Sequence, residues 1–280
     1  MEKGKLYLVA TPIGNLDDIT IRAIKTLEMV DVIAAEDTRH SLKLLNYLQI
    51  SKPLISYHRH NEENKSEILI NKLLNGENIA LITDAGTPAI SDPGEEIVKE
   101  AIINNIDIIP IPGACALINA LICSGMNTKE FSFYGFLPLN KKSRKNKFEE
   151  IKKENKTIII YEAPHKINNT LIDILEEIGD INIVIARELT KIHEEFIRGK
   201  VSEIQEKYNN LKGEIIIIIE GNKKISTTED IKELLINMEL EKHYEYYKKQ
   251  NLEKKEIIKK IAKDRNVSKN EIYMKLINID

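Results

Sequence analysis

Three short apolar runs each lead into a turn of small, polar or proline residues, and this repeated arrangement constrains the fold more than any other feature of the sequence. Residues 6–10 lead into the turn 11–15, residues 78–84 into the turn 85–94, and residues 106–112 into the turn 113–116. In an open α/β sheet, such turns lie together at the carboxyl ends of the strands, where ligands bind. The sequence therefore predicts a ligand site built from these loops. A plain surface connection before the helix near Gly94 is the alternative interpretation of the second turn.

The alternation of strands and helices predicts an α/β protein with two α/β domains and a small helical module. Five short apolar strands separated by helical patterns favour a largely parallel sheet in residues 1–128. Longer strands begin near Phe131 and favour a second α/β domain, with a mixed sheet, in residues 129–222. Beyond a predicted linker at residues 221–224, helical patterns alone occur, so residues 223–280 form the helical module.

Capping residues mark two of the predicted helix starts. Asp17 or Asp18 could cap the helix whose apolar residues recur from Ile21. Ser202 and Gln205 have the spacing of a capping box, which predicts a helix over residues 202–208.

Composition and missing motifs exclude several classes of protein. The apolar share is 42%, but no run approaches the ~20 apolar residues of a membrane helix, and the N-terminus lacks signal-peptide features, so we expect a cytoplasmic protein. The net charge of −3 gives no overall sign of nucleic-acid binding. Cys115 and Cys123 lie at neither a metal nor a disulfide spacing, and the histidines show no metal pattern, so we expect no metal. Nucleotide-triphosphate loops, Rossmann glycine motifs and hydrolase serine elbows are absent.

Charged residues follow the second predicted strand. The tetrapeptide Glu36-Asp-Thr-Arg39 begins where that strand ends, so its side chains could face the ligand site. The alternative interpretation is local: Asp37 or Thr38 caps the next helix, and Glu36 pairs with Arg39.

Six motifs, taken together and in order over residues 5–221, resemble a known family. They are TPIGNLDDIT at 11–20, EDTR at 36–39, TDAGTPAISDPG at 83–94, PG at 112–113, YEAPH at 161–165 and ARELTKIHEE at 186–195. The family is that of bacterial small-subunit ribosomal RNA methyltransferase I, in the tetrapyrrole-methylase superfamily. Its members 2′-O-methylate a cytidine of 16S ribosomal RNA from S-adenosylmethionine. The resemblance implies that the methyl donor lies in a cleft between two α/β domains and that the protein is a homodimer.

The resemblance also implies a donor site, residue by residue. The superfamily's Gly-Asp-Pro loop corresponds to residues 86–88, so Thr87 replaces an aspartate, and the Pro-Gly-x-Ser-Ala turn corresponds to residues 112–116, so Cys115 replaces a serine. That serine's hydroxyl contact is therefore in doubt here. The implied donor-binding residues are Pro12, which faces the acceptor side, and Asp84, Gly86, Thr87, Ile90, Cys115, Ala116, Tyr161, Glu162, Ala163 and Ala186.

The implied reaction is an in-line displacement in which a ribose hydroxyl attacks a sulfonium methyl. Alignment supplies most of the acceleration, because the donor is already activated, and a general base is helpful without being a single residue. The polar residues near strand ends are candidates for this role, with none ranked first: Glu36, Asp37, Arg39, Arg187 and Glu188. The alternative is that these charges form an interdomain salt-bridge network.

Two basic clusters are candidates for RNA contact. In the tail, a helix over residues 256–264, a turn and a second helix capped by Ser268 and Glu271 make a helix-turn-helix pattern, which also resembles the family's C-terminal module. Its basic residues include Lys259, Lys260, Lys263 and Arg265, and the second cluster contains Lys141, Lys142, Arg144 and Lys145. Binding to phosphates of 16S ribosomal RNA or the small ribosomal subunit is the functional interpretation. A solvated lysine face is the ordinary alternative.

Two other functions fit parts of the sequence. The same cleft could methylate a tetrapyrrole, although such an enzyme needs no basic helical tail. The protein could also be an RNA-binding assembly factor that does not catalyse a reaction. Binding of the methyl donor would distinguish the assembly factor from the RNA methyltransferase and the tetrapyrrole methylase.

Overall fold

The structure is a computed structural model, and it describes residues 2–208, 211–221, 235–250 and 252–276. The chain divides into two compact units, Met1–Asn222 and Lys223–Asp280, which are described separately. Residues 222–224 of the predicted linker lie outside the described residues.

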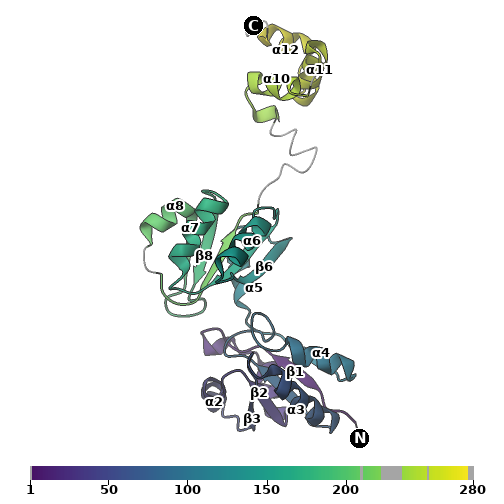
Figure 1. Cartoon of the computed structure of the whole chain (residues 1–280), viewed down its shortest axis with the longest axis vertical. Helices are drawn as coiled ribbons and strands as arrows, with labels where there is room; N and C mark the ends of the chain where they lie inside the picture. Colours follow the sequence, from purple (N-terminus) through teal and green to yellow (C-terminus); the bar gives the residue numbers. More distant parts are fainter. Residues whose placement is uncertain (1, 209–210, 222–234, 251, 277–280) are drawn as a thin grey trace. The chain divides into compact units, whose positions relative to one another are not determined.

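The first sheet is entirely parallel, with the strand order β3-β2-β4-β1-β5 (Figure 1). Its strands are β1 Leu6–Val9, β2 Val32–Ala35, β3 Leu54–Ser56, β4 Ile79–Ile82 and β5 Ile108–Ile111. Its helices are α1 Ile21–Met29, α2 Thr38–Tyr47, α3 Glu62–Leu74 and α4 Glu95–Ile103, and a short 3-10 helix, η1, spans Leu16–Asp18.

Helices cover both faces of this sheet, which explains why its central strands are apolar throughout. On one face, Leu6 and Leu81 pack with Leu69 of α3 and Ile97 of α4. On the other face, residues of α1 and α2 pack against the alternate strand positions, for example Leu27 against Val9. β1 lies between β4 and β5. The loops that follow β1 and β4 are therefore neighbours at the carboxyl edge of the sheet.

The second sheet is mixed, with the strand order β6-β7-β10-β8-β9, and only β6 and β7 are parallel to each other. Its strands are β6 Phe131–Phe136, β7 Thr157–Glu162, β8 Asn182–Arg187, β9 Glu195–Lys200 and β10 Ile215–Ile219. The helices α6 Lys141–Ile151, α7 Ile167–Glu177 and α8 Val201–Lys207 join them. These two sheets, with helices at the C-terminal end, confirm the predicted fold class.

The five isoleucines of β10 alternate between two cores, as the period of a strand requires. Ile215 and Ile217 pack on the face that carries α6, α7 and α8. Ile216 and Ile218 pack on the opposite face against Leu117 of α5, which spans Ala116–Ser124. Thus α5 precedes residue 128 in the sequence and yet covers the second sheet.

The C-terminal unit contains α10 Leu240–Lys248, α11 Lys254–Asp264 and α12 Lys269–Leu276 around a small apolar core. A buried polar network lies beside this core. Asp264 accepts a hydrogen bond from the Tyr247 hydroxyl at 2.6 Å and lies 3.3 Å from His243 Nε2. The Arg265 guanidinium donates to His243 Nδ1 at 3.2 Å and to the Met238 carbonyl. Burial and the neighbouring Arg265 lower the pKa of His243, so the neutral imidazole links two helices.

The caps predicted for α1 and α8 are wrong, whereas Ser268 accepts a hydrogen bond from the Glu271 amide at 3.2 Å at the start of α12, as predicted. Asp17 and Asp18 lie in η1, and Thr20 caps α1 by accepting a hydrogen bond from the Ala23 amide at 3.1 Å. Ser202 lies inside α8, whose cap residue is Lys200, and its hydroxyl donates to Asp180 at 3.0 Å. At α1 a neighbouring residue in the sequence caps the helix, and at α8 the Ser202 side chain bonds to a residue distant in the sequence.

Within the described ranges, no helix is long and apolar enough to cross a membrane.

Candidate active site

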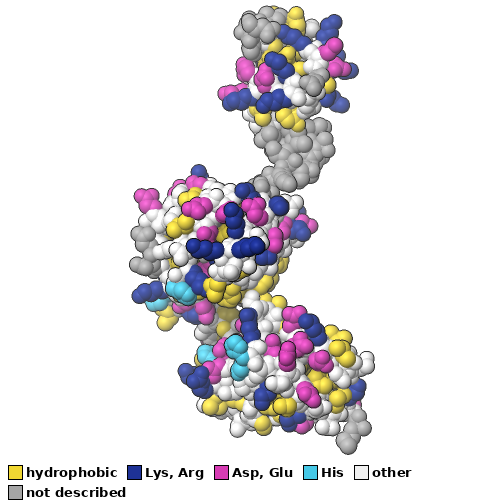
Figure 2. Space-filling view, in the orientation of Figure 1, with side chains coloured by type: hydrophobic (Ala, Val, Ile, Leu, Met, Phe, Trp, Pro, Cys, Tyr) yellow, Lys and Arg dark blue, Asp and Glu magenta, His cyan; other side chains and the backbone are white. Residues whose placement is uncertain are grey.

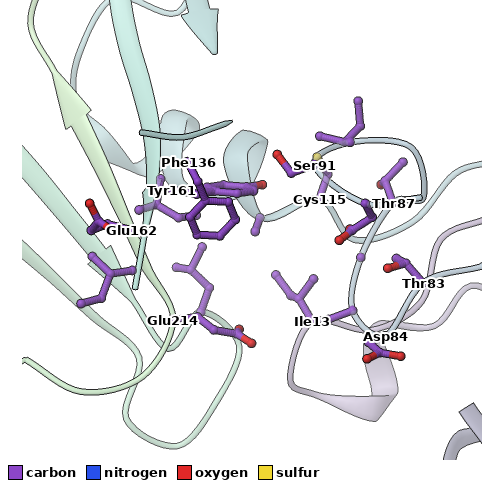
Figure 3. A pocket seen from close by; sticks show the side chains of 18 of the residues that line it. Ile13, Thr83, Asp84, Thr87, Ser91, Cys115, Phe136, Tyr161, Glu162 and Glu214 are labelled. Atoms are coloured by element: carbon purple, nitrogen blue, oxygen red, sulfur yellow. The ribbon is translucent and has the colours of Figure 1, made fainter. Parts of the chain in front are cut away.

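A cavity of about 460 Å³ lies within the first unit, where loops of the first sheet face the ends of strands of the second. Ile13, Asp84, Gly86 and Thr87 come from the loops after β1 and β4, and Cys115 comes from the start of α5. Figure 3 shows Ile13, Asp84, Thr87 and Cys115 opposite a wall that contains Phe136, Tyr161, Glu162 and Glu214. The predicted convergence of three loops therefore occurs at a real cavity.

Gly86 joins two of these loops through its backbone. Its amide and carbonyl form reciprocal hydrogen bonds with Thr11 of 3.1 and 2.8 Å. Its φ is +88°, in the left-handed region that favours glycine, and an added Cβ would lie 3.1 Å from Ile13 Cγ2. The backbone at Gly86 therefore forms part of the cavity wall that a side chain would obstruct.

The rest of the same loop has unusual backbone geometry. Ala89 and Ser91 have φ of +66° and +63°, and Ile90 lies between them on the cavity wall. The Ala89 amide donates to the Pro93 carbonyl at 3.3 Å, and Arg59 donates to the Ser91 carbonyl. Non-glycine residues in this region cost roughly 1–3 kcal/mol each and cluster at ligand sites. The loop is thus held in a shape that presents Ile90 to the cavity.

The two departures from the family pattern both have structural consequences. Thr87 donates its hydroxyl hydrogen to the Ala114 carbonyl at 3.0 Å, so it ties the loop after β4 to the loop after β5. Cys115 is the cap residue of α5 but makes no side-chain cap hydrogen bond. The side chain at position 115 therefore lines the cavity without capping the helix.

Glu162 is almost completely buried in the opposite wall, with 4% of its surface exposed. It accepts hydrogen bonds from the Ala163 amide at 2.8 Å and the Thr170 hydroxyl at 2.5 Å. Thr170 in turn accepts from Arg144 at 2.8 Å, and Arg144 forms an ion pair of 2.6 Å with Asp173. These contacts fix the turn after β7, which carries Ala163 on the cavity wall.

Three carboxylates lie on the side of the first sheet, one in the loop after β2 and two in the loop after β4. Glu36 accepts a hydrogen bond from Thr83 at 2.6 Å, and Asp84 accepts one from the Asp37 amide at 3.1 Å. Burial raises the pKa of Asp84, and burial together with the charge of Glu36 raises the pKa of Asp92 to about 6. The sequence analysis did not single out Asp92, although it lies within the 83–94 motif. Its position in that motif was the only available signal.

The five predicted catalytic residues are not brought together. Only Glu36 lines the cavity. Asp37 caps α2, as the local interpretation expected. The exposed Arg39 forms its ion pair with Asp37, at 2.7 Å, and not with Glu36 as that interpretation expected. Arg187 pairs with Glu195 at 2.7 Å, and Glu188 pairs with Lys191 at 3.0 Å.

Most of the predicted donor-binding residues line the cavity, and two do not. Those on the wall are Asp84, Gly86, Thr87, Ile90, Cys115, Ala116, Tyr161, Glu162 and Ala163. Ala186 is buried in the core beneath the wall. Pro12 lines an adjoining cavity, on the side where the acceptor was expected.

The predicted RNA-binding residues are of two kinds: lysines whose side chains are exposed, and arginines whose side chains bond to other residues of the protein. Lys141, Lys142 and Lys145 are exposed on α6, where Figure 2 shows several basic side chains together, and Lys259 and Lys263 are exposed on α11. Lys260 lies over the Tyr247 ring, 5.0 Å from its centre. Arg144 and Arg265 point into the polar networks described above. The structure thus leaves the lysines accessible and commits the two arginines to internal contacts.

Comparison with known proteins first identifies the class to which this protein belongs. The family model described as Tetrapyrrole (Corrin/Porphyrin) Methylases matches residues 5–205. A solved uroporphyrin-III C-methyl transferase from Thermus thermophilus, complexed with S-adenyl homocysteine, has a TM-score of 0.56 at 15% identity, covering 78% of this chain and 98% of that chain. At this identity the likeness shows the fold alone. The class is that of the tetrapyrrole methylases.

Several relatives with much higher identity are named ribosomal RNA small subunit methyltransferase I. One from Halalkalibacterium halodurans is 49% identical over 275 residues, which are 97% of this chain and 94% of the relative. One from Thermotoga maritima is 46% identical over 220 residues, which are 78% of this chain and 99% of the relative. The chain belongs to the ribosomal RNA small subunit methyltransferase I family, as its motifs indicated. The second relative has no counterpart of about a fifth of this chain.

Proposed function

We propose that the protein transfers the methyl group of S-adenosylmethionine to the 2′-hydroxyl of a cytidine in 16S ribosomal RNA. The observation that carries this proposal is the near full-length similarity to proteins named ribosomal RNA small subunit methyltransferase I, combined with a cavity at the matched motifs. The precise hydroxyl and nucleotide type rest on the resemblance described above.

The charge of the cavity fits this donor. The described residues that line it include five acidic side chains and no Lys, Arg or His: the acidic ones are Glu36, Asp84, Asp92, Glu162 and Glu214. S-adenosylmethionine carries a sulfonium and an ammonium against one carboxylate, so its net charge is positive and this surface attracts it. The same surface repels nucleotide phosphates.

The residues that would hold the donor come from both walls. The backbone at Gly86, with Thr87 and Ile90, would lie along one side of it. Cys115 and Ala116 would flank it at the start of α5, and Tyr161 and Ala163 would close the opposite side. Phe136 supports Tyr161 through an edge contact, with ring centres 5.7 Å apart. Apolar and aromatic walls with few polar groups are typical of sites for nucleoside-like ligands.

When bound, S-adenosylmethionine would supply a methyl group that its sulfonium already activates. The protein's main contribution would then be to align the acceptor hydroxyl with that methyl group. A carboxylate near both would accept the hydroxyl proton. Of the five catalytic candidates, Glu36 lines the cavity. Asp84, which was predicted as a donor-binding residue, lines it too, and its raised pKa favours its accepting a proton.

The exposed lysines of α6 and α11 would contact RNA phosphates. Lys255, Lys259 and Lys263 lie four residues apart and are all exposed, so they form one stripe along α11. The Thermotoga maritima relative has the same name but lacks a counterpart of about a fifth of this chain. A segment that this relative lacks would therefore contribute to RNA affinity and not to the chemical step.

The proposal includes a homodimer in the cytoplasm. The exposed Ile118 and Ile122 of α5 lie on a helix whose other side covers the second sheet, so an apolar surface remains available to a partner copy. Light scattering on the full chain measures the mass directly.

The decisive experiment maps 2′-O-methyl groups on 16S ribosomal RNA from cells with and without the gene. We expect one cytidine to lose its methyl group, and purified protein with S-adenosylmethionine to restore it on small subunits from the deleted cells. An unchanged map would refute the proposal. Calorimetry with S-adenosylhomocysteine, with and without a chelator, then separates the rivals: absence of binding indicates an assembly factor, and loss of binding with chelator indicates a metal.

A further inference from the structure

A second cavity, of about 440 Å³, adjoins the donor cavity and has a different lining. The two share Ile13, Thr83, Asp84, Ala85 and Glu214. A group bound in the second cavity therefore contacts the same wall as a donor bound in the first.

The second cavity contains basic residues, which the donor cavity lacks. His40 and Lys43 are exposed residues of α2, and Lys191 comes from the loop after β8. Lys191 also pairs with Glu188 at 3.0 Å and with Glu214 at 3.2 Å, and His40 lies close enough to Asp84 to oppose the rise in the pKa of that carboxyl. Neither His40 nor Lys43 forms an ion pair with another described residue, and the Lys43 ammonium therefore presents positive charge at this cavity.

Ser41 provides an independent sign of a ligand. The residue is 2% exposed and lines the second cavity, and its Oγ has no hydrogen-bond partner among the described residues. Buried hydroxyl groups are normally hydrogen-bonded, because leaving one unsatisfied is costly. The two other buried serines of the described ranges, Ser66 and Ser124, follow this rule: Ser66 bonds to the Tyr57 hydroxyl at 3.0 Å and Ser124 to the Leu121 carbonyl at 2.7 Å.

We propose that the second cavity binds the target ribonucleotide of the RNA, with the Ser41 hydroxyl bonded to the nucleoside and Lys43 beside its phosphate. The inference rests on the proposed function and adds the acceptor's place to it. Ile13 and Leu44 supply apolar contacts for a base removed from its stack, and Asp84 on the shared wall lies where the ribose hydroxyl meets the donor cavity. One nucleotide is held between a cationic rim and an apolar floor.

The test uses the full chain saturated with S-adenosylhomocysteine and small ribosomal subunits from cells without the gene. Ser41→Ala should weaken subunit binding by roughly 3- to 10-fold, as expected for one lost hydrogen bond, without lowering the unfolding temperature. Ser66→Ala is the matched control, because it removes a buried serine hydroxyl that has a partner. It should lower the unfolding temperature and leave subunit affinity unchanged.

Lys43→Gln provides a second, surface test. It should weaken binding and flatten the slope of log affinity against log salt by about 0.7–0.9, as for one lost phosphate contact. Lys25→Gln, at an exposed lysine of α1, is its control. Both Ser41→Ala and Lys43→Gln should keep wild-type affinity for S-adenosylhomocysteine by calorimetry.

The outcomes separate this inference from the proposed function. If the wild-type protein methylates small subunits but Ser41→Ala and Lys43→Gln bind them as tightly as their controls do, the cavity assignment is wrong and the proposed function stands. If the wild-type protein binds S-adenosylhomocysteine but neither binds nor methylates subunits, the proposed function itself fails.

Discussion

Gly86→Ala separates the cost of a strained backbone from the effect of an obstructed donor site. An alanine at the φ of +88° destabilises the fold by about 1–2 kcal/mol, because its Cβ crowds the following carbonyl in the left-handed region. The same Cβ would lie 3.1 Å from Ile13 Cγ2, closer than ordinary van der Waals contact, so Ile13 must shift. Because Ile13 lines both cavities, this shift reaches the cavity proposed to hold the donor.

Gly125→Ala is a control with the same backbone strain and no contact. Gly125 follows α5 with a φ of +79°, and an added Cβ there would meet nothing within 4 Å. We expect both variants to lose about 1–2 kcal/mol in urea unfolding. Only Gly86→Ala should lose affinity for S-adenosylhomocysteine, by about tenfold, which corresponds to about 1.4 kcal/mol.

Calorimetric titration of the two variants and the wild-type protein measures the difference directly. Equal affinity in both variants would show that the Gly86 backbone does not form the donor wall. A comparable loss in Gly125→Ala would show that loss of stability, and not local contact, reduces affinity.

Three further predictions concern the other parts of the site. Thr170→Val should lower the free energy of unfolding by about 1.5–3 kcal/mol in urea, because buried Glu162 loses a charge-assisted hydrogen bond and Arg144 loses an acceptor; an unchanged midpoint would contradict this. Asp92→Asn should raise thermal stability at pH 7.5, and this gain should shrink toward pH 4. The pKa of about 6 means that the neutral Asp92 carboxyl stabilises the fold at low pH and that this contribution is lost as the pH rises through 6; a pH-independent effect would refute the assignment. Replacing both Lys259 and Lys263 with Gln should flatten the salt slope of subunit binding by about 1.4–1.8 while donor affinity stays constant, and an unchanged slope would remove α11 from the RNA interface.

The fold was predictable because its signals are local and repeated. Each short apolar run of the first sheet ends at a turn, and the parallel order follows from helices between strands. The caps of α1 and α8 were not predictable in the same way. Thr20 caps α1 through a local hydrogen bond from Ala23, so either Asp17 or Asp18 was simply the wrong choice among neighbouring polar residues. Ser202 instead bonds to Asp180, which lies 22 residues earlier, and that contact depends on tertiary structure.

Site residues were predictable where a motif fixes the backbone, and less so where charges choose partners. Gly86 and Ile90 line the cavity because the loop itself does. Arg187 and Glu188 belong to an equally clear motif, yet they pair with Glu195 and Lys191. A charged side chain can reach several partners, so its sequence position leaves its direction open. For Asp92, the sequence shows that the residue belongs to the motif, but it does not show that the carboxyl is buried beside Glu36.

Arg144 shows how one basic segment serves two purposes. Its neighbours Lys141, Lys142 and Lys145 are exposed, whereas the Arg144 side chain extends inward to Thr170 and Asp173. Thr170 then holds Glu162, which binds the Ala163 amide on the cavity wall. A guanidinium can bond to both partners at once with its rigid donors, which a lysine ammonium does not reproduce. The arginine within this lysine cluster is therefore explained by support of the cavity wall, and the lysines remain exposed for the proposed RNA contact.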